Sequence, residues 1–232
     1  MLKTAIVLAG GFGTRLQSVV KDLPKPMAPV AGYPFLKYVL DFCSKQGLEN
    51  IILSVGYKHE DINIYFKQSF QNLKLNYCIE QNALGTGGAI RESLKKTNDE
   101  NVVVLNGDTL FTINLQHFAN LHRSSNSDLS IALKPMVNFD RYGIVSTNSS
   151  NQITGFEEKS FRWNGNINGG VYILNQSVSK YFPESENFSF EKNFMEQKFD
   201  LLKMSGFVFD DYFIDIGVPE DYERAQYELA GF

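Results

Sequence analysis

Short apolar runs alternate with segments of helical length through the first half of the chain, and this alternation constrains the fold most strongly. The apolar runs predict strands at Thr4–Leu8, Ile51–Val55, Leu73–Ile79 and Asn101–Leu105. The spacing of apolar residues between them predicts helices at Phe35–Ser44, Glu60–Phe70 and Gly88–Leu94. Strands separated by helices are typical of βαβ units, whose strands pair in parallel. We therefore expect an α/β fold with a mostly parallel sheet.

The second half of the chain is less regular and contains fewer predicted helices. Its apolar runs predict strands at Leu129–Leu133, Tyr142–Ser146, Ile153–Phe156, Val171–Leu174, Leu201–Phe209 and Phe213–Ile216, followed by a closing helix at Pro219–Leu229. No Gly/Ser-rich linker separates the two halves. A length of 232 residues suits one domain with a sizeable core. We expect a single domain over residues 1–232.

Composition excludes several classes of protein. The 22 Lys and Arg against 26 Asp and Glu give a net charge of −4, which argues against a nucleic-acid partner. Cys43 and Cys78 form no CxxC pair, so neither a disulfide framework nor a cysteine-rich zinc site is expected. No apolar run is long enough to span a membrane. We expect a cytoplasmic protein without a membrane partner.

The first predicted strand leads into a glycine-rich segment, Leu8–Leu16 (LAGGFGTRL). Ligands of parallel sheets bind beyond the carboxyl ends of the strands, so the residues after Leu8, Ile79 and Leu105 are candidates for a site. Gly10, Gly11 and Gly13 allow backbone N–H groups to approach an anion. The segment matches neither the GxGxxG dinucleotide pattern nor the P-loop, and a plain structural turn stays equally open. Arg15 favours a polyphosphate ligand.

A proline-rich segment follows and fixes one lysine. Four of the seven prolines lie within the 11 residues from Pro24 to Pro34, so the backbone around Lys25 should be stiff. Residues 1–26 contain four basic residues against one acidic residue, a local charge of 4 − 1 = +3. These charged residues are Lys3, Arg15, Lys21, Lys25 and Asp22.

Together these motifs and later ones resemble the sugar-1-phosphate nucleotidyltransferase family, along nearly the whole chain. The motifs are Gly10–Leu16, Pro24–Pro26, Leu84–Gly88, Asn106–Asp108, Glu158-Lys159, Asn168–Gly170 and Phe213–Pro219. The resemblance implies a Rossmann-like three-layer α/β/α sandwich of the nucleotide-diphospho-sugar transferase type, with a mixed, mostly parallel central sheet. Residues 1–110 would form the nucleotide-binding half and residues 111–232 the sugar-phosphate-binding half.

The family reaction joins an NTP and a sugar 1-phosphate into an NDP-sugar and releases pyrophosphate. Within the family, the short chain and its motif variants are most similar to guanylyltransferases that act on D-glycero-α-D-manno-heptose 1-phosphate. That similarity implies GTP as the donor, GDP-mannoheptose as the product and a role in surface or capsule polysaccharide biosynthesis. A homodimer is left open.

The resemblance also implies roles for individual residues. The catalytic residues would be Arg15, Lys25 and Asp108. The nucleotide would contact Leu8, Ala9, Gly10, Gly11, Gly13, Thr14, Arg15, Lys25, Glu80, Gly85, Thr86 and Asp108. The sugar phosphate would contact Gly107, Glu158, Lys159, Asn168 and Gly170. Asp108 and Asp215 would bind Mg²⁺.

The chemistry of the acidic residues agrees with these roles. Asp108 follows an apolar strand, although a turn-forming Asp is also possible. Asp215 interrupts an apolar run, and a buried carboxylate requires a partner such as a metal ion. Two carboxylates plus phosphate oxygens suit Mg²⁺. Glu80 could accept hydrogen bonds from the N1–H and N2 groups of guanine, or merely end an exposed strand. Gly85 would let the backbone pack against the base.

Several alternatives remain open. Lys159 could be a solvated residue of a charge run, and Asn168-Gly169 is also a common hairpin pair. Within the class, the substrate pair could be GTP with mannose 1-phosphate, or UTP or CTP with another sugar phosphate or choline phosphate. A non-catalytic nucleotide-sugar-binding regulatory subunit is an alternative of another class. A nicotinamide-dependent oxidoreductase is a third, which the absence of the GxGxxG pattern disfavours. A sugar 1-phosphate is largely dianionic at pH 7, so no general base is required.

Overall fold

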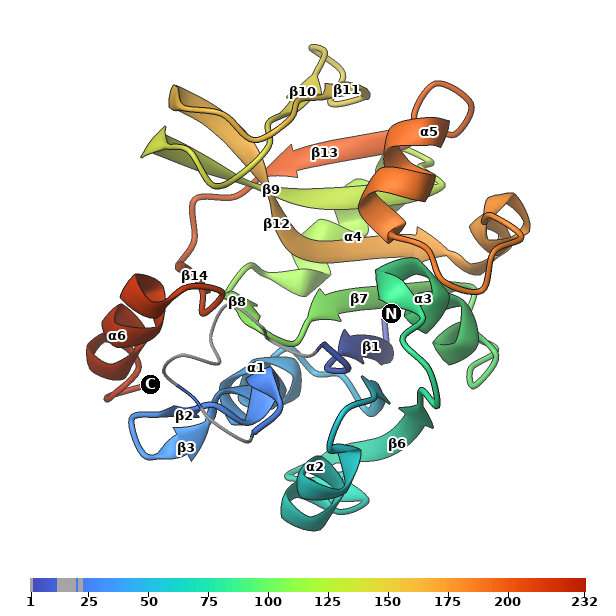
Figure 1. The fold of residues 1–232 in the computed structure, drawn as a ribbon. Helices are drawn as coiled ribbons and strands as arrows, with labels where there is room; N and C mark the ends of the chain where they lie inside the picture. The colour runs from blue at the N-terminus through green and yellow to red at the C-terminus, as the bar shows by residue number, and fades with distance from the viewer. Residues whose placement is uncertain (1, 12–19, 21–22) are drawn as a thin grey trace.

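The computed structural model describes residues 2–11, 20 and 23–232. At its centre is an eight-stranded sheet in the order β13-β9-β12-β7-β1-β4-β6-β5 (Figure 1). β1 (Thr4–Leu8) lies between β7 (Asn101–Asn106) and β4 (Asn50–Val55) and is parallel to both. β6 (Leu73–Ile79) continues the sheet in parallel beside β4. The predicted strands of the first half are thus confirmed to within one residue at their ends.

The second half adds the strands that make the sheet mixed. β12 (Arg162–Asn175) runs antiparallel to both β7 and β9 (Leu129–Phe139), whereas β13 (Met204–Val208) is parallel to β9. Four of the seven strand pairings in the sheet are therefore parallel. The strands β9 and β12 extend beyond their predicted apolar runs, because polar residues, glycines and a proline interrupt the apolar pattern along the outer part of both strands.

Small two-stranded sheets complete the strands of the fold. β10 (Val145–Thr147) pairs with β11 (Ile153–Phe156). The strand that was predicted to begin at Tyr142 therefore begins at Val145 instead. β14 (Phe213–Asp215) pairs with β8 (Thr109–Phe111), which brings the end of the chain beside the end of β7. The remaining short strands are β2 (Pro29–Val30), β3 (Tyr33–Pro34) and β5 (Ser69–Phe70).

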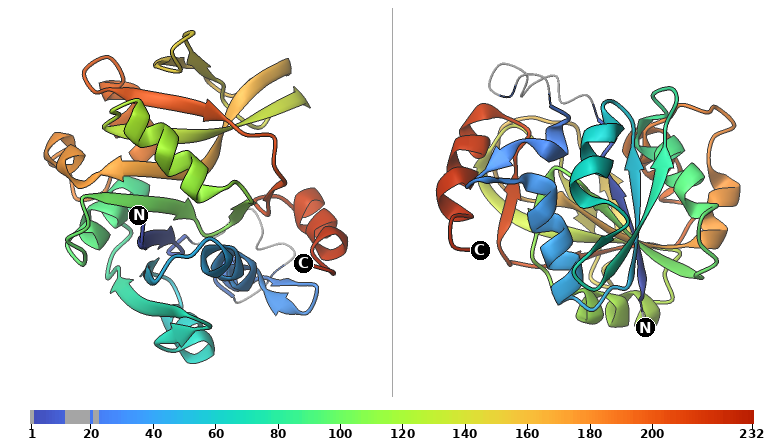
Figure 2. Two further views of the ribbon diagram at one scale, coloured as in Figure 1. Left: turned by 180° about the vertical axis from the view of Figure 1, so that it is seen from behind. Right: turned by 90° about the horizontal axis from the view of Figure 1, so that it is seen from below.

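Helices cover both faces of the sheet, which confirms the three-layer sandwich. One face carries α1 (Phe35–Lys45), α2 (His59–Phe66), α4 (Leu115–Ser124) and α6 (Pro219–Glu228). The other face carries α3 (Gly85–Leu94) and the π-helix Phe190–Met195, which continues into α5 (Glu196–Lys198). Figure 2 shows α4 lying over the sheet on the side opposite α3. None of the helices described is both long and apolar enough to cross a membrane.

The strand predicted over Leu201–Phe209 spans only Met204–Val208, and the sequence reasoning also missed or misplaced other features. Helix α4 was not predicted, although Leu115, Phe118 and Ala119 follow helical spacing and Asn114 caps the helix by accepting from the His117 N–H at 2.8 Å. The helix expected to reach Phe70 ends at Phe66, because Lys67 has a positive φ of 54°. Lys3 precedes the amino end of β1, so it does not share a charge cluster with Lys25.

The position of Lys3 follows from the direction of the strand. It pairs with Glu49 at 2.9 Å, and β1 carries the chain about 16 Å from there to the glycine-rich segment. The local charge of +3 counted along the sequence therefore does not describe one place in space.

A chain segment around Phe188 packs directly against the first turns of α3. The Gly87 N–H donates to the Phe188 carbonyl at 2.9 Å. A Cβ atom at Gly87 would lie only 2.1 Å from Cε2 of the Phe188 ring. The absence of a side chain at Gly87 is therefore what lets this segment pack on the helix.

We predict that Gly87→Ala lowers the free energy of unfolding by about 2 kcal/mol, because the added methyl group overpacks the contact with Phe188. Urea unfolding of the two proteins measures the difference. Gly155→Ala is the matched control, since a Cβ atom there meets nothing within 4 Å. Equal stability losses in both variants would contradict the packing argument.

Candidate active site

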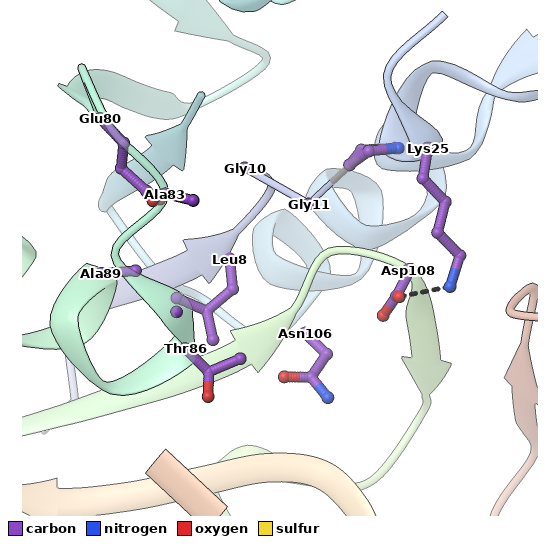
Figure 3. A pocket seen from close by; sticks show the side chains of 12 residues that line it. Leu8, Gly10, Gly11, Lys25, Glu80, Ala83, Thr86, Ala89, Asn106 and Asp108 are labelled. Atoms are coloured by element: carbon purple, nitrogen blue, oxygen red, sulfur yellow. Dashed lines mark hydrogen bonds and ion pairs between the residues drawn. The ribbon is translucent and has the colours of Figure 1, made fainter. Parts of the chain in front are cut away.

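The carboxyl ends of β1, β6 and β7 converge on a cavity of about 330 Å³, shown in Figure 3. We call it the Gly10 cavity. Its lining includes the predicted residues Leu8, Gly10, Gly11, Lys25, Glu80, Gly85, Thr86 and Asp108, together with Asn106. The residues that follow Leu8, Ile79 and Leu105 thus meet in one place, as the parallel arrangement of the strands requires.

Lys25 lies at one end of this cavity, between two carboxylates. Its Nζ is 2.5 Å from Oδ2 of Asp108 and 3.9 Å from Oδ1 of Asp215. Pro24 and Pro26 flank it at the start of a short 3₁₀ turn, and its side chain is only 13% exposed. The expectation of a stiff backbone that holds Lys25 in place agrees with this geometry.

Asp215 reaches the same ammonium group from the other half of the chain. Its Oδ1 accepts from the Gly217 N–H at 2.7 Å, and its Oδ2 accepts from the Tyr142 hydroxyl at 3.3 Å. Burial raises the pKa of the Asp215 carboxyl, the negative charge of Asp108 raises it further, and Lys25 opposes both effects. Within the described part of the chain, this pair of carboxylates has one more negative charge than Lys25 balances.

These carboxylates fit a magnesium ion in composition. Both are oxygen ligands, which Mg²⁺ prefers, and their shared excess negative charge favours a cation. Within the described residues, no group of three His, Cys, Asp or Glu side chains is placed to hold a metal. Among the described residues, Asp108 and Asp215 would supply two carboxylate ligands, and phosphate oxygens and water would supply others.

Glu80 lies at the opposite end of the Gly10 cavity from Lys25 (Figure 3). Its carboxylate accepts from the Ser54 hydroxyl at 3.0 Å and from the Leu84 N–H at 3.3 Å. It also lies against Gly10, where a Cβ atom would come within 2.6 Å of Oε1. Burial raises the pKa of Glu80, and the two hydrogen bonds counteract this. The carboxylate is thus held at the cavity wall.

A second cavity of about 360 Å³, which we call the Asn168 cavity, adjoins the first and shares Asn106 with it. Four of the predicted sugar-phosphate residues line it: Glu158, Lys159, Asn168 and Gly170. Asp215 lines it as well. Glu158 pairs with Lys192 at 3.2 Å, whereas the exposed Lys159 forms no ion pair with a described carboxylate.

Two of the predicted site residues are glycines that chain packing requires, although they were expected to be required by ligand contact. Gly85 has a φ of +68°, and a Cβ atom there would lie 2.6 Å from the Phe188 carbonyl oxygen, so this glycine is required by chain packing. Gly170 has a φ of +71°, and its Cβ would collide with the Asn106 side chain. Both residues still line their cavities, but neither glycine is explained by a ligand alone.

Other predicted residues are not brought to either cavity surface. Ala9 is buried and donates its N–H to the Ser54 carbonyl at 2.7 Å. Gly107 is buried and packs so closely on β1 that its Cβ would lie 2.6 Å from the Leu8 carbonyl oxygen. Gly13, Thr14 and Arg15 lie outside the described residues, so their predicted roles remain predictions.

Sequence reasoning missed several residues of the Asn168 cavity, among them Tyr142, Gly143 and Glu191. The first two were assigned to the start of a strand, whereas they form the loop before β10. Glu191 accepts from the Thr86 hydroxyl at 2.7 Å and from the Tyr172 hydroxyl at 3.4 Å, so it connects the walls of the two cavities. No local pattern marks Glu191, because its partners come from α3 and β12.

Comparison with known proteins shows which family shares this chain's sequence and fold. The family model described as "Nucleotidyl transferase" matches residues 4–231. The chain is 52% identical to the D-glycero-alpha-D-manno-heptose 1-phosphate guanylyltransferase of Aneurinibacillus thermoaerophilus, over 98% of this chain and 99% of that protein. It is 48% identical to the enzyme of the same name from Campylobacter jejuni subsp. jejuni serotype O:2, over 94% and 96% of the two chains.

A solved structure shares both the fold and the full length. HddC from Yersinia pseudotuberculosis, in a crystal structure complexed with GMP-PN, superposes with a TM-score of 0.85 at 36% identity, over 98% of this chain and 100% of that chain. The fold, the family model and the near-complete coverage of both relatives lead to one conclusion. The chain belongs to the nucleotidyl transferase family.

Proposed function

We propose that this protein is an enzyme that transfers GMP from GTP to D-glycero-α-D-manno-heptose 1-phosphate, forming GDP-mannoheptose and pyrophosphate. The observation that carries the proposal is that the two cavities adjoin at Asn106, while Lys25 in the first cavity contacts both Asp108 of that cavity and Asp215 of the second. A nucleotide in the Gly10 cavity and a sugar phosphate in the Asn168 cavity would bring their phosphates together there. The relatives at 52% and 48% identity carry the name of this activity.

The chemical step requires little beyond positioning and charge neutralisation. A phosphate oxygen of the sugar 1-phosphate attacks the α-phosphorus of GTP, and the bond from that phosphorus to the bridging oxygen breaks, so pyrophosphate leaves. Because the attacking phosphate is largely dianionic at pH 7, no residue needs to remove a proton. Lys25 would neutralise charge on the reacting phosphates, and the backbone at Gly10 and Gly11 would bind the nucleotide.

Asp108 and Asp215 would hold Mg²⁺, which supplies Lewis-acid stabilisation of the phosphate oxygens when bound. Lys159, Glu158 and Asn168 would bind the sugar phosphate. By the family resemblance, Arg15 would neutralise the departing pyrophosphate. We further propose that the enzyme acts in the cytoplasm and supplies the activated sugar for a surface or capsule polysaccharide.

The test is a pyrophosphate-release assay that crosses the four common NTPs with the 1-phosphates of mannose, glucose and mannoheptose. We expect GTP with the mannoheptose 1-phosphate to give the highest kcat/KM. Preference for mannose 1-phosphate would assign the enzyme to the mannose-specific class instead. The absence of pyrophosphate release with every pair would contradict an enzymatic function and favour a regulatory subunit.

Glu80 provides a test of the donor base. Because its carboxylate is held at the end of the Gly10 cavity away from Lys25, it is placed to accept from the N1–H and N2 groups of guanine. We predict that Glu80→Gln lowers kcat/KM for GTP by about 10- to 100-fold, the value of charge-assisted hydrogen bonds, and lowers the preference for GTP over ATP.

The matched control for this variant is Glu49→Gln. Glu49 is an exposed carboxylate that pairs with Lys3 at the amino ends of β4 and β1, away from the cavity, and its replacement should leave kcat/KM unchanged. An unchanged ratio of GTP to ATP use in Glu80→Gln would show that Glu80 does not read the base.

A further inference from the structure

Arg141 lies in the loop between β9 and β10, and its guanidinium forms a hydrogen bond with the C-terminal helix α6. Nη2 of Arg141 donates to Oδ2 of Asp221 at 2.5 Å. The other oxygen of the same carboxylate, Oδ1, lies 3.1 Å from Nη1 of Arg224, one turn further along α6. The Asp221 side chain is only 8% exposed, so its charge is costly to bury without these two partners. Asp221 therefore holds the Arg141 guanidinium in a defined place.

Arg141 also lines a cavity. Arg141, Tyr142, Lys159 and Asp215 line this space of about 260 Å³, which we call the Arg141 cavity. Tyr142, Lys159 and Asp215 also line the Asn168 cavity, so the two spaces adjoin. The Arg141 side chain is 43% exposed, and a guanidinium that donates one N–H to Asp221 has further N–H groups available. Arg141 thus presents hydrogen-bond donors to the cavity that Lys159 and Asp215 also line.

The local charge explains why an additional cation would be required there. Five carboxylates line the Asn168 cavity against two lysines, Lys159 and Lys192; the carboxylates are Glu157, Glu158, Glu191, Glu196 and Asp215. A sugar 1-phosphate brings a further charge of about −1.5 to −2 at pH 7. Arg224 also pairs with Glu228 at 3.3 Å, so the arginine that shares Asp221 with Arg141 has a carboxylate of its own. Arg141 is therefore the cation that the Arg141 cavity adds beside Lys159.

We propose that Arg141 is a second cationic residue of the acceptor site, which binds the phosphate of the sugar 1-phosphate together with Lys159. Asp221 is the positioning residue that orients it. This inference rests on the proposed function, because it names the residue that recognises the acceptor's phosphate. The planar fork of Arg suits the task, since one edge can contact a carboxylate while other N–H groups contact phosphate oxygens.

The test separates the two substrates in steady-state assays of the full chain. We expect Arg141→Gln to raise the KM for D-glycero-α-D-manno-heptose 1-phosphate about 10- to 100-fold, as the loss of a charge-assisted hydrogen bond does, with KM for GTP changed less than about threefold. Arg141→Lys keeps the charge but loses the fork, so it should recover only part of the loss. Asp221→Asn should raise the KM for the acceptor in the same direction but less, because Arg141 remains but is no longer held.

Arg224→Gln is the matched control, because Arg224 contacts the same carboxylate but does not line the Arg141 cavity. We expect its KM for the acceptor to stay within about twofold of that of the wild type. If Arg141→Gln lowers the melting temperature but leaves the KM for the acceptor unchanged, Arg141 only attaches the loop to α6 and the proposal is wrong. Calorimetric titration of the acceptor, with a non-hydrolysable GTP analogue present, gives the same comparison without turnover.

The outcomes also distinguish this inference from the proposed function. A wild-type enzyme that is active while Arg141→Gln is equally active overturns only the role of Arg141. A wild type that neither releases pyrophosphate nor binds any sugar 1-phosphate overturns the proposed function and this inference with it.

Discussion

Replacing Lys25 by alanine is expected to lower kcat by about 10³-fold while the protein remains folded, comparable to the loss of a key charge-stabilising donor in other enzymes. The Lys25 ammonium is the described cation that contacts both Asp108 and Asp215, at 2.5 and 3.9 Å. Its side chain is largely shielded from water, so its charge is poorly screened where the phosphates react. Single-turnover pyrophosphate release measures the effect on the chemical step directly.

The control for Lys25 is another partly buried lysine that pairs with a carboxylate. Lys37 on α1 donates to Asp41 at 2.6 Å and lines neither the Gly10 cavity nor the Asn168 cavity. Lys37→Ala should change the melting temperature but not kcat. If Lys25→Ala releases pyrophosphate at nearly the wild-type rate, Lys25 is a structural partner of Asp108 and not a catalytic residue.

Asp108→Asn is expected to lower turnover by about 10²- to 10³-fold and to raise the Mg²⁺ concentration for half-maximal activity at least about tenfold. The amide keeps the size of the side chain but removes the charge that a hard cation requires. Asp215→Asn should behave similarly, because both carboxylates face the same point at Lys25. A magnesium titration of activity at fixed GTP measures both quantities.

Asp210→Asn is a suitable control for these two variants. Asp210 accepts from Lys134 at 2.7 Å but is 84% exposed, and it precedes β14 without lining either cavity. We expect its magnesium dependence to match the wild type. A normal magnesium dependence in Asp108→Asn would instead place the metal elsewhere and leave Asp108 as a partner of Lys25 alone.

The sequence correctly predicted the site residues that directly follow the carboxyl ends of parallel strands. Gly10, Glu80 and Asp108 each follow a predicted parallel strand, and the common direction of those strands brings them to one cavity. The same reasoning misplaced Lys3, since charges were added along the chain without regard to the direction of β1. Proximity in sequence is a poor guide across a strand, because each residue advances the chain by about 3.3 Å.

The glycines illustrate a second difference between pattern and structure. Gly85 and Gly170 were assigned to ligand contact, yet each has a positive φ and a neighbouring chain that leaves no room for a Cβ atom. A sequence motif indicates that a position needs glycine, but it does not indicate which neighbouring atoms would collide with a Cβ atom there. The packing of residues 186–190 on α3 and of Asn106 on Gly170 involves partners far away in the sequence.

The sequence by itself determined the alternation of strands and helices, the glycine-rich and proline-rich segments and the candidate carboxylates, because periodicity and backbone preference are local properties. Only the tertiary structure brought Lys25 to Asp108 across 83 positions and Arg141 to Asp221 across 80. It also placed Tyr142 and Glu191 at the second cavity. Such contacts depend on how strands are ordered and how loops fold over the sheet, which no local pattern encodes.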